Sequence, residues 1–420
     1  MSVLLISAEY PPREGGIGDY TRLLALTLHE QGQAAAVLTS AGAPGLPGDP
    51  LQVYPLVGGW GWDGLRTIAR FVREHQPAIL HLQYQTGAYR MHPAIHFLPD
   101  VLRRLPAAPR LCVTMHDLRV PYLFPKAGRV RSWVVAHMLR RAAAVVVTNG
   151  GDWVRLGGAA DPASGPRPAP RGGEGREAAA GSRDLLRPLA PGALRRPPTL
   201  IPLASSLPTQ LPGYDRGAWR ARMGIPEAAP LLGHFGLLHP SKGADLLVEA
   251  LARLPHTHLL MVGGGTGATD PGNAPFAAAL RDEIVRRGLA KRVHWTGRCP
   301  ADEAAAFLLA CDVVAMPFRD GASFRRSSLV AALALGCAVV TTPPQGPAEV
   351  WLGEGRPTLA DGVNAFLAPA EAGALAEAIA ALSADAAGRA RLGAGAARLG
   401  QAFTWEKVGK RTTELYGQVR

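Results

Sequence analysis

The stretch that restricts the fold most runs over residues 313–342, where a strand, a loop, a helix and another strand follow one another. Residues 313–316 and 337–342 are almost entirely apolar, as expected of parallel strands that are buried on both faces. Residues 329–335 are small and apolar, which is typical of a packed helix, and Gly336 supplies the left-handed residue that ends it. Two parallel strands need a crossover such as this helix, so the stretch predicts an α/β fold.

The loop inside this stretch carries its chemistry. Asp320, Arg325 and Arg326 lie just before the helix, and the hydroxyl of Ser327 or Ser328 is expected to cap its first turn. The free amides of a helix start attract anions, and two guanidinium groups add donors that match phosphate oxygens. The loop therefore predicts a site for a phosphorylated ligand. The alternative is a solvated arginine pair on a surface loop.

Length, charge and cysteine content narrow the class of protein. A chain of 420 residues is longer than a single domain with one hydrophobic core usually is, so we expect two domains. A net charge of +12 favours anionic partners, but no nucleic-acid-binding module is recognisable and we expect no nucleic acid. The four cysteines lack metal-binding spacing, and no apolar run reaches the ~18–20 residues of a membrane span. Because the first apolar run is also too short for a signal peptide, we expect free thiols and a cytoplasmic location.

A strand, a glycine-rich loop and a helix open the chain. Gly15, Gly16 and Gly18 fall in this loop, and Asp19 or Thr21 is expected to begin the helix. Glycines let a backbone approach a ligand closely, although their spacing here is not that of the dinucleotide fingerprint. We interpret the loop as a ligand site. A loop that merely needs flexible residues is the alternative.

Polar residues follow two apolar strands of the N-terminal half. Residues 79–84 and 110–115 are predicted strands, and His116 stands at the carboxyl end of the second. Doubly wound sheets place their ligand groups at this edge. We therefore interpret His116 as a functional residue, the alternative being a satisfied imidazole in the core.

The second half of the chain restarts the alternation of strands and helices. Residues 231–235 and 258–262 are predicted strands, with a helix at 244–254 between them. Lys242 lies in the turn before that helix, where it would point at the same anion as the arginine loop. Gly264 belongs to a run that formally fits a G-x-G-x-x-A pattern after a strand, which by itself is a weak indication of a nucleotide site.

The chain resembles the family 4 glycosyltransferases of the GT-B fold, as a member of a divergent subset. The resemblance covers nearly the whole length except residues 157–198, and the order and spacing of the matching pieces are more specific than any one of them. The pieces are Gly15-Gly-Ile-Gly-Asp-Tyr20, Thr114-Met-His-Asp117, Phe235-Gly-Leu-Leu-His-Pro-Ser-Lys-Gly243, Leu260-Met-Val-Gly-Gly-Gly265, Val293-His-Trp-Thr-Gly297, Asp312-Val-Val-Ala-Met-Pro-Phe318, Ala334-Leu-Gly-Cys-Ala-Val-Val340 and Phe403-Thr-Trp405.

The resemblance implies two Rossmann-like, doubly wound domains that face a cleft. The first would span residues 1–210 on the acceptor side and the second residues 211–400 on the nucleotide-sugar side. A helix at 401–420 would pack back on the N-terminal domain. Residues 157–198 are rich in Pro, Gly, Ala and Arg and are predicted to form a disordered or loose insertion.

The resemblance also implies a retaining, metal-independent transfer of a sugar from a nucleoside-diphosphate sugar to a hydroxyl acceptor, with no cofactor. The acceptor would be a glycan, a lipid-linked molecule or a small molecule, as in polysaccharide or cell-envelope biosynthesis, with peripheral contact to an anionic membrane. His116 and Asp320 would be catalytic. The donor would be bound by Gly15, Gly16, Gly18, Lys242, Gly264, Ser323, Arg325, Arg326, Ser327 and Ser328.

Two departures from the family pattern bear on activity. Ser323 and Ala331 stand where the family commonly has two glutamates eight positions apart, and a phosphate-binding arginine is missing after Gly236. We expect Asp320 and Ser323 to serve the sugar side, and Arg325 or Arg326 to replace the missing arginine. The alternatives are a catalytically inactive nucleotide-sugar-binding or scaffold protein, or a GT-B-like epimerase or phosphorylase.

Overall fold

The chain folds into two compact units. The first comprises Met1–Pro202, Leu352–Glu354 and Trp405–Arg420, and the second comprises Leu203–Trp351 and Gly355–Thr404. Most of the predicted insertion lies outside the described residues. The computed structural model describes residues 2–13, 15–118, 128–158, 194–263, 265 and 273–420.

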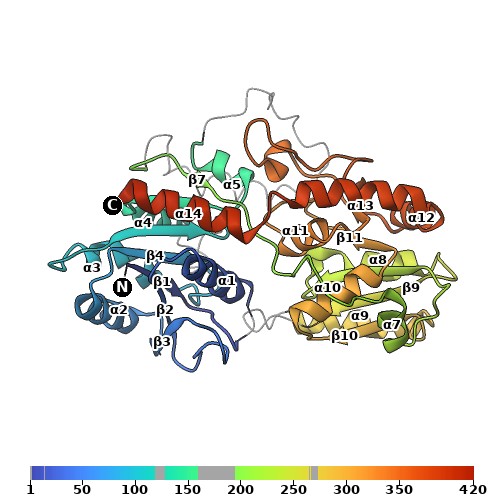
Figure 1. Cartoon of the computed structure of the whole chain (residues 1–420), viewed down its shortest axis with the longest axis horizontal. Helices are drawn as coiled ribbons and strands as arrows, with labels where there is room; N and C mark the ends of the chain where they lie inside the picture. Colours follow the sequence, from blue (N-terminus) through green and yellow to red (C-terminus); the bar gives the residue numbers. More distant parts are fainter. Residues whose placement is uncertain (1, 14, 119–127, 159–193, 264, 266–272) are drawn as a thin grey trace. The chain divides into compact units, whose positions relative to one another are not determined.

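The first unit is built on a seven-stranded sheet in which every strand pair is parallel, with the order β3-β2-β1-β4-β5-β6-β7 (Figure 1). The order reverses between β1 and β4, and open α/β sheets bind their ligands outside the carboxyl ends of strands at such a reversal. The strands are β1 (Val3–Ser7), β2 (Ala35–Ser40), β3 (Gln52–Val57), β4 (Ile79–Tyr84), β5 (Arg110–Met115), β6 (Ala144–Val147) and β7 (Thr199–Leu200).

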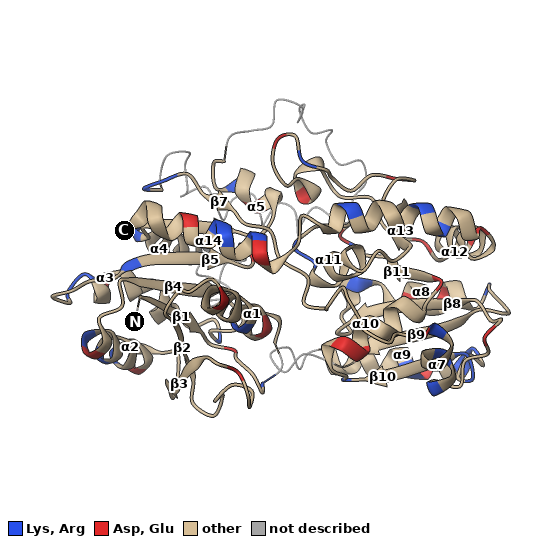
Figure 2. Ribbon diagram, viewed as in Figure 1, with Lys and Arg blue, Asp and Glu red and all other residues tan. Residues whose placement is uncertain are grey.

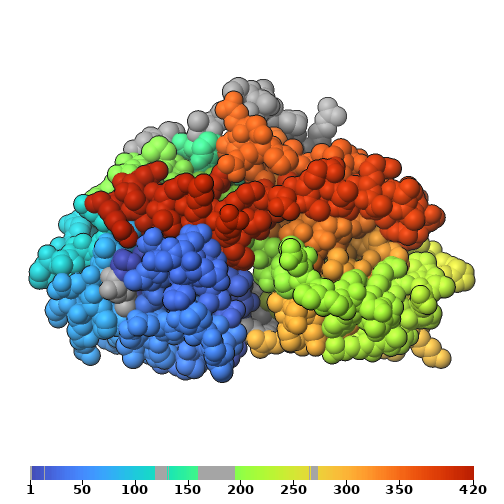
Figure 3. All heavy atoms as spheres, viewed as in Figure 1, coloured from blue at the N-terminus to red at the C-terminus, as the bar shows by residue number. Residues whose placement is uncertain are grey.

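Helices cover this sheet, and the last helix of the chain is one of them. The helix α14 packs against α1, and its exposed side chains form a strip on the surface of the first unit (Figure 3). Tyr416 Oη of α14 lies 2.6 Å from His81 Nδ1 of β4, and Arg411 donates to the carbonyl of Leu200 at 3.2 Å. The helices are α1 (Gly16–Glu30), α2 (Trp62–His75), η1 (Pro93–Phe97), α3 (Leu98–Leu102), α4 (Gly128–Arg141), α5 (Gly150–Arg155) and α14 (Trp405–Val419).

The second unit has a six-stranded sheet, again parallel throughout, with the order β10-β9-β8-β11-β12-β13. Its order reverses between β8 and β11. The strands are β8 (Leu231–Gly236), β9 (His258–Gly263), β10 (Val293–Gly297), β11 (Val313–Met316), β12 (Val339–Thr341) and β13 (Phe366–Leu367). Helices of this unit are α7 (Arg216–Arg222), η2 (Pro240–Lys242), α8 (Ala244–Leu251), α9 (Ala274–Arg286), α10 (Ala301–Ala310), α11 (Ser327–Ala334), η4 (Pro347–Val350), α12 (Ala372–Ala384) and α13 (Ala386–Gly400).

Glycines allow α13 to lie very close to neighbouring backbone. A Cβ atom on Gly393 would lie 2.6 Å from the carbonyl oxygen of Gly336, and one on Gly400 would lie 2.6 Å from Ala334 Cα. A Cβ atom on Gly395 would overlap the carbonyl of Val363. The missing side chains of this helix therefore decide how closely it approaches α11 and the loop before β13.

The structure confirms the α/β alternation and corrects the predicted start of the first helix. The strands β4, β5 and β11 lie at their predicted bounds, and the predicted helix at the end of the chain is α14. The helix α1, however, begins at Gly16 rather than at Asp19 or Thr21, so two of the three loop glycines are helical. The strand β3 and the helix α13 were not predicted, because β3 is only partly buried and the glycines of α13 weaken its helical pattern.

Candidate active site

The carboxyl ends of β8 and β11 bring predicted residues together. Gly236 ends β8 with a φ of 118°, a conformation that other residues rarely adopt. A Cβ atom at Gly236 would lie 2.8 Å from Lys242 Nζ and 3.6 Å from Ser328 Cβ. The end of β8, the short helix η2 and the start of α11 therefore meet at one point, and the glycine leaves room there for the ammonium group.

Lys242 is a perturbed cation at this point. Burial, together with repulsion from Arg326, lowers the pKa of Lys242 to about 8. Two positive groups held near each other in a partly buried site favour an anionic ligand, because its charge would stabilise both of them. From the loop positions of Lys242 and Arg326, the sequence predicted that both side chains point at the same anion.

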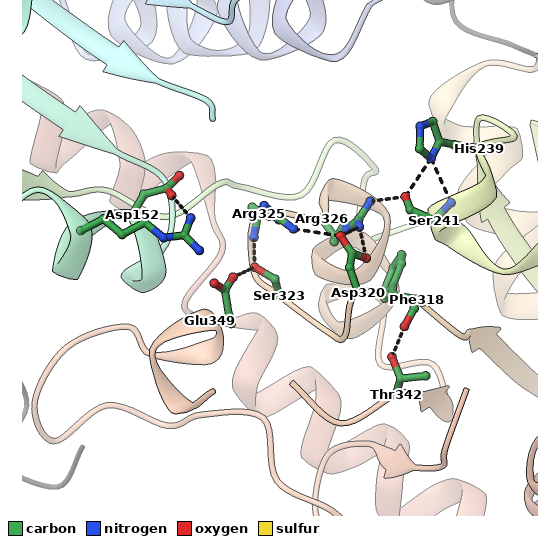
Figure 4. Close-up of polar contacts among 11 residues, drawn as sticks. Asp152, His239, Ser241, Phe318, Asp320, Ser323, Arg325, Arg326, Thr342 and Glu349 are labelled. Carbon is green, nitrogen blue, oxygen red and sulfur yellow. Dashed lines mark hydrogen bonds and ion pairs between the residues drawn. The ribbon is translucent and has the colours of Figure 1, made fainter. Parts of the chain in front are cut away.

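Asp320 lies between the two arginines of the loop (Figure 4). Arg325 Nη2 donates to Asp320 Oδ2 at 3.0 Å, and Arg326 Nη2 donates to both carboxylate oxygens. We call Lys242, Arg325 and Arg326 the cationic cluster. It contains three basic side chains, of which the two arginines pair with Asp320, so it keeps a positive excess. Asp320 orients the guanidinium groups, and its catalytic role stays a prediction.

Several neighbours fix the plane of the Arg326 guanidinium. Its Cζ lies 4.9 Å from the centre of the Phe318 ring, and its Nη1 donates to Ser241 Oγ at 3.4 Å. Ser241 Oγ in turn lies 2.8 Å from His239 Nδ1, as Figure 4 shows. A guanidinium held by a ring face, a hydroxyl and a carboxylate is oriented before any ligand arrives.

Ser323 is buried and connects the loop to η4. Its Oγ donates to Glu349 Oε2 at 2.8 Å and accepts from the amide of Arg325 at 3.3 Å. The amide of Phe324 donates to the carbonyl of Glu349 at 3.0 Å. Ser323 therefore braces the loop against η4, and its predicted contact with a ligand stays a prediction.

The start of α11 differs from the predicted cap. Arg326 is the N-cap residue, and no side chain forms a capping hydrogen bond there, so the prediction of Ser327 or Ser328 as the N-cap is wrong. The serines are instead the first two helical residues, Ser327 exposed and Ser328 buried. The loop enters the helix through extended backbone at Arg326, which leaves the first-turn amides without a side-chain acceptor. Such amides suit an anion.

In the first unit, His116 is held at the carboxyl end of β5. Its Nε2 lies 3.0 Å from Gln83 Oε1, and its amide donates to the carbonyl of Tyr84 at 3.0 Å. The Tyr20 ring of α1 meets the imidazole edge-on, with the ring centres 4.8 Å apart. Burial lowers the pKa of His116 to about 4, so the ring is neutral at pH 7. We call Gln83, His116 and Tyr20 the histidine cluster.

The predicted glycines of the first unit have different surroundings. Gly15 is the N-cap of α1, and a Cβ atom there would overlap the Glu9 carboxylate. Gly16 is exposed with open space where a Cβ would stand, which leaves its backbone accessible. Gly18 is buried, and a Cβ there would lie 3.0 Å from the backbone of Tyr10, so this glycine serves helix packing. Gly264 lies outside the described residues.

Sequence reasoning missed three residues at these places. Gln83 and Glu349 each contact a predicted site residue, and Glu9 is a buried carboxylate beside Gly15. The sequence does contain an indication for Gln83. His81 and Gln83 are polar residues two positions apart in a predicted apolar strand, so their side chains lie on the same face of the sheet. No local pattern indicated Glu349, since it lies 26 residues from its partner.

Two family models match the chain. The model described as "Glycosyl transferase 4-like domain" matches residues 15–159, and the model described as "Glycosyl transferases group 1" matches residues 229–385. The two ranges contain the histidine cluster and the cationic cluster, respectively. Together they cover most of the chain and follow its two units.

Curated relatives and solved structures agree with the models. A D-inositol 3-phosphate glycosyltransferase of Stackebrandtia nassauensis is 34% identical over 215 residues, which are 48% of this chain and 45% of that protein. One from Xylanimonas cellulosilytica is 33% identical over 48% of this chain and 46% of that protein. This chain therefore spans about half the length of the curated relatives that it matches.

The solved structures match over the full chain. HepE of Anabaena, solved with UDP and glucose, has a TM-score of 0.69 at 18% identity, covering 100% of both chains. A sucrose-phosphate synthase from Thermosynechococcus elongatus has a TM-score of 0.68 at 21% identity, covering 100% of this chain and 99% of that one. At these identities the likeness establishes the fold, which is the predicted one.

Proposed function

This chain belongs to the family of group 1, GT4-type glycosyltransferases, and we propose that it transfers a sugar from a nucleoside-diphosphate sugar to a hydroxyl acceptor with retention of configuration. The observation that carries the proposal is the cationic cluster at the strand-order reversal of the second unit. Structures of Anabaena HepE with UDP and with UDP-glucose support a nucleotide-sugar donor. We propose no metal and no cofactor for the reaction.

The cationic cluster suits the leaving group of such a transfer. As the bond to the sugar breaks, negative charge develops on the diphosphate, and the sugar becomes oxocarbenium-like. Lys242 and the already oriented Arg326 would stabilise that charge more in the transition state than in the ground state. The first-turn amides of α11 would add neutral donors.

The histidine cluster suits the sugar side. A neutral His116 can exchange hydrogen bonds with sugar hydroxyls and places no positive charge near the forming oxocarbenium ion. A donor phosphate oxygen would accept the proton of the acceptor hydroxyl on the same face, which is the arrangement that a retaining transfer requires. Asp320 and Ser323 would act by holding the arginine loop in place.

Calorimetric titration tests the proposal directly. We expect one of UDP, GDP and ADP, or one of their sugar conjugates, to bind with micromolar affinity, with no change when a chelator is added. Turnover with an acceptor would then separate a transferase from an inactive binding protein, and sugar interconversion without an acceptor would indicate an epimerase. Failure of all the nucleotides to bind would contradict the proposal.

The same titration has an expected pH dependence. Because the pKa of Lys242 is lowered to about 8, the free protein loses this charge as the pH rises through that value. A diphosphate binds the protonated form, so its Kd should rise roughly 30-fold between pH 7 and pH 9.5. Lys242→Arg should flatten the profile, since a guanidinium does not titrate in this range. A flat profile for the unaltered protein would contradict the role of Lys242.

The first unit also presents an exposed aromatic row, formed by Trp62, Phe97 and Trp133. The Trp62 and Trp133 side chains are 52% and 47% exposed, and their ring centres lie 5.5 and 6.2 Å from that of Phe97. Arg103 and Arg104 directly follow α3 and are exposed, and Figure 2 shows basic residues around α2 and α3. None of the described helices has the length and apolarity needed to cross a bilayer. We propose peripheral contact between this surface and an anionic membrane, with the protein acting on the cytoplasmic side.

Vesicle co-sedimentation tests the membrane contact. We expect binding to vesicles that contain phosphatidylglycerol, weak binding to pure phosphatidylcholine, and weakening with salt. The double change Trp62→Ser and Trp133→Ser should reduce the bound fraction about tenfold, because the rings would no longer be buried in the interface. Val285→Ser removes a side chain that is 69% exposed on the second unit and serves as the control. Equal binding of the double variant would contradict the proposal.

A further inference from the structure

Gln83 is a buried amide with one unpartnered end. The residue is 0% exposed in the middle of the first sheet, and Oε1 faces His116 Nε2 at 3.0 Å. Its Nε2 atom is buried and has no hydrogen-bond partner among the described residues. An unsatisfied buried donor destabilises a fold, so its persistence beside His116 points to a ligand oxygen that satisfies it.

The contact with Gln83 decides where His116 carries its proton. An amide oxygen only accepts, so the facing Nε2 of the imidazole must be the N–H donor. The neutral ring then leaves Nδ1 unprotonated. The pairing therefore selects one of the two neutral tautomers and also fixes the rotation of the ring.

The surroundings of His116 reinforce the neutral form. Tyr20 presents a ring from α1, and His81, two positions before Gln83 on β4, is itself buried with its pKa lowered to about 3. Asp117, the adjacent carboxylate, accepts from Gln85 Nε2 at 3.1 Å. None of these groups is a cation, and the imidazole is partly buried, so protonation is disfavoured.

We propose that Gln83 is a positioning residue, which holds His116 as the Nε2–H tautomer through its amide oxygen and donates its free amide hydrogens to a hydroxyl of the transferred sugar. The second half of this statement rests on the proposed function, and the first half does not. The arrangement would place two neutral groups, one donor and one acceptor, against the sugar.

Nitrogen-15 spectra of the imidazole rings in the full chain test the first half. We expect the unaltered protein to show His116 protonated at Nε2 and not titrating above pH 5. Gln83→Glu keeps the shape but adds a carboxylate, which should raise the pKa of His116 by about two units, from about 4 to about 6. Gln52→Leu, at an exposed position of β3, is the control and should leave the His116 signals unchanged.

Kinetics and binding test the second half. Gln83→Leu should lower kcat between roughly 10- and 100-fold while leaving the Kd of the nucleoside diphosphate alone unchanged, because that ligand lacks the sugar. A His116 protonated at Nδ1, or no pKa change in Gln83→Glu, would overturn the proposal, as would an unchanged kcat in Gln83→Leu. If instead no nucleotide bound to the unaltered protein, the proposed function would fail and the tautomer result would stand.

Discussion

Replacing Arg326 by Ala should lower kcat/KM for sugar transfer by about 10²–10³-fold. The guanidinium is 16% exposed and held by Asp320, Ser241 and the Phe318 ring, so it would meet the leaving diphosphate without reorganising. Its loss would remove a charge and two oriented donors, and would leave Asp320 with one partner fewer. The measurement is initial-rate kinetics with the donor identified by calorimetry, together with the Kd of the nucleotide.

Arg319→Ala is the matched control for this change. Arg319 lies on the same loop, but its side chain is 43% exposed and pairs with Asp245 on α8. We expect its loss to alter kcat/KM by less than about threefold, since exposed ion pairs contribute little. Arg326→Lys should recover only part of the activity, because an ammonium lacks the planar group that lies over the Phe318 ring and donates to Ser241 and Asp320 through separate nitrogens. If Arg326→Ala and the unaltered protein had equal kcat/KM values, Arg326 would have no role in sugar transfer.

Replacing Gly395 by Ala should destabilise the second unit by about 2–3 kcal/mol. In an exposed helix the same change stabilises, since alanine favours the helix by about 1 kcal/mol. At Gly395, however, a Cβ atom would overlap the carbonyl of Val363 and lie 3.1 Å from Asn364 Cα. The backbone on one side must move, and close packing of α13 is lost. Thermal unfolding followed by circular dichroism should show a Tm lower by roughly 5–10 °C.

Gly417→Ala provides a control of opposite sign. Gly417 lies in α14, and none of the described atoms outside its own turn lies within 4 Å of the position that a Cβ atom would take. The substitution should therefore stabilise by about 0.5 kcal/mol. The same chemical change is thus expected to act in opposite directions in two helices. A Tm for Gly395→Ala at or above that of the unaltered protein would show that the loop before β13 accommodates the methyl group.

Much of the fold follows from local patterns. Apolar runs of four to six residues marked β4, β5 and β11, because strands that are buried on both faces exclude polar residues along their whole length. The helix starts were harder to place. Gly16 and Gly18 read as a loop, since glycine is a poor helix former, yet packing of α1 against the backbone of Tyr10 requires a glycine at position 18. Tertiary packing overrode propensity there.

The sequence predicted which basic residues form the cationic cluster, but not the contacts and distances between them. Lys242 and Arg326 are 84 positions apart, but each stands in a loop after a parallel strand, and such loops gather at one edge of a sheet. Which carboxylate would accompany them could not be inferred. The loop position of Asp320 predicts a catalytic role, which stays a prediction, but it does not indicate that the carboxylate lies between two guanidinium groups or that Glu349 contacts Ser323.

By itself, the sequence determined the α/β class, the two-part organisation and the residues that bring positive charge to the second sheet, because periodicity, composition and loop position are local properties of a chain. Only the tertiary structure decided the partners of those residues. The contact of Gln83 with His116, the bracing of Ser323 by Glu349 and the lowered pKa of Lys242 all depend on distances between segments far apart in sequence. Desolvation and hydrogen-bond geometry act over a few ångströms in space, and no local pattern in the chain encodes those distances.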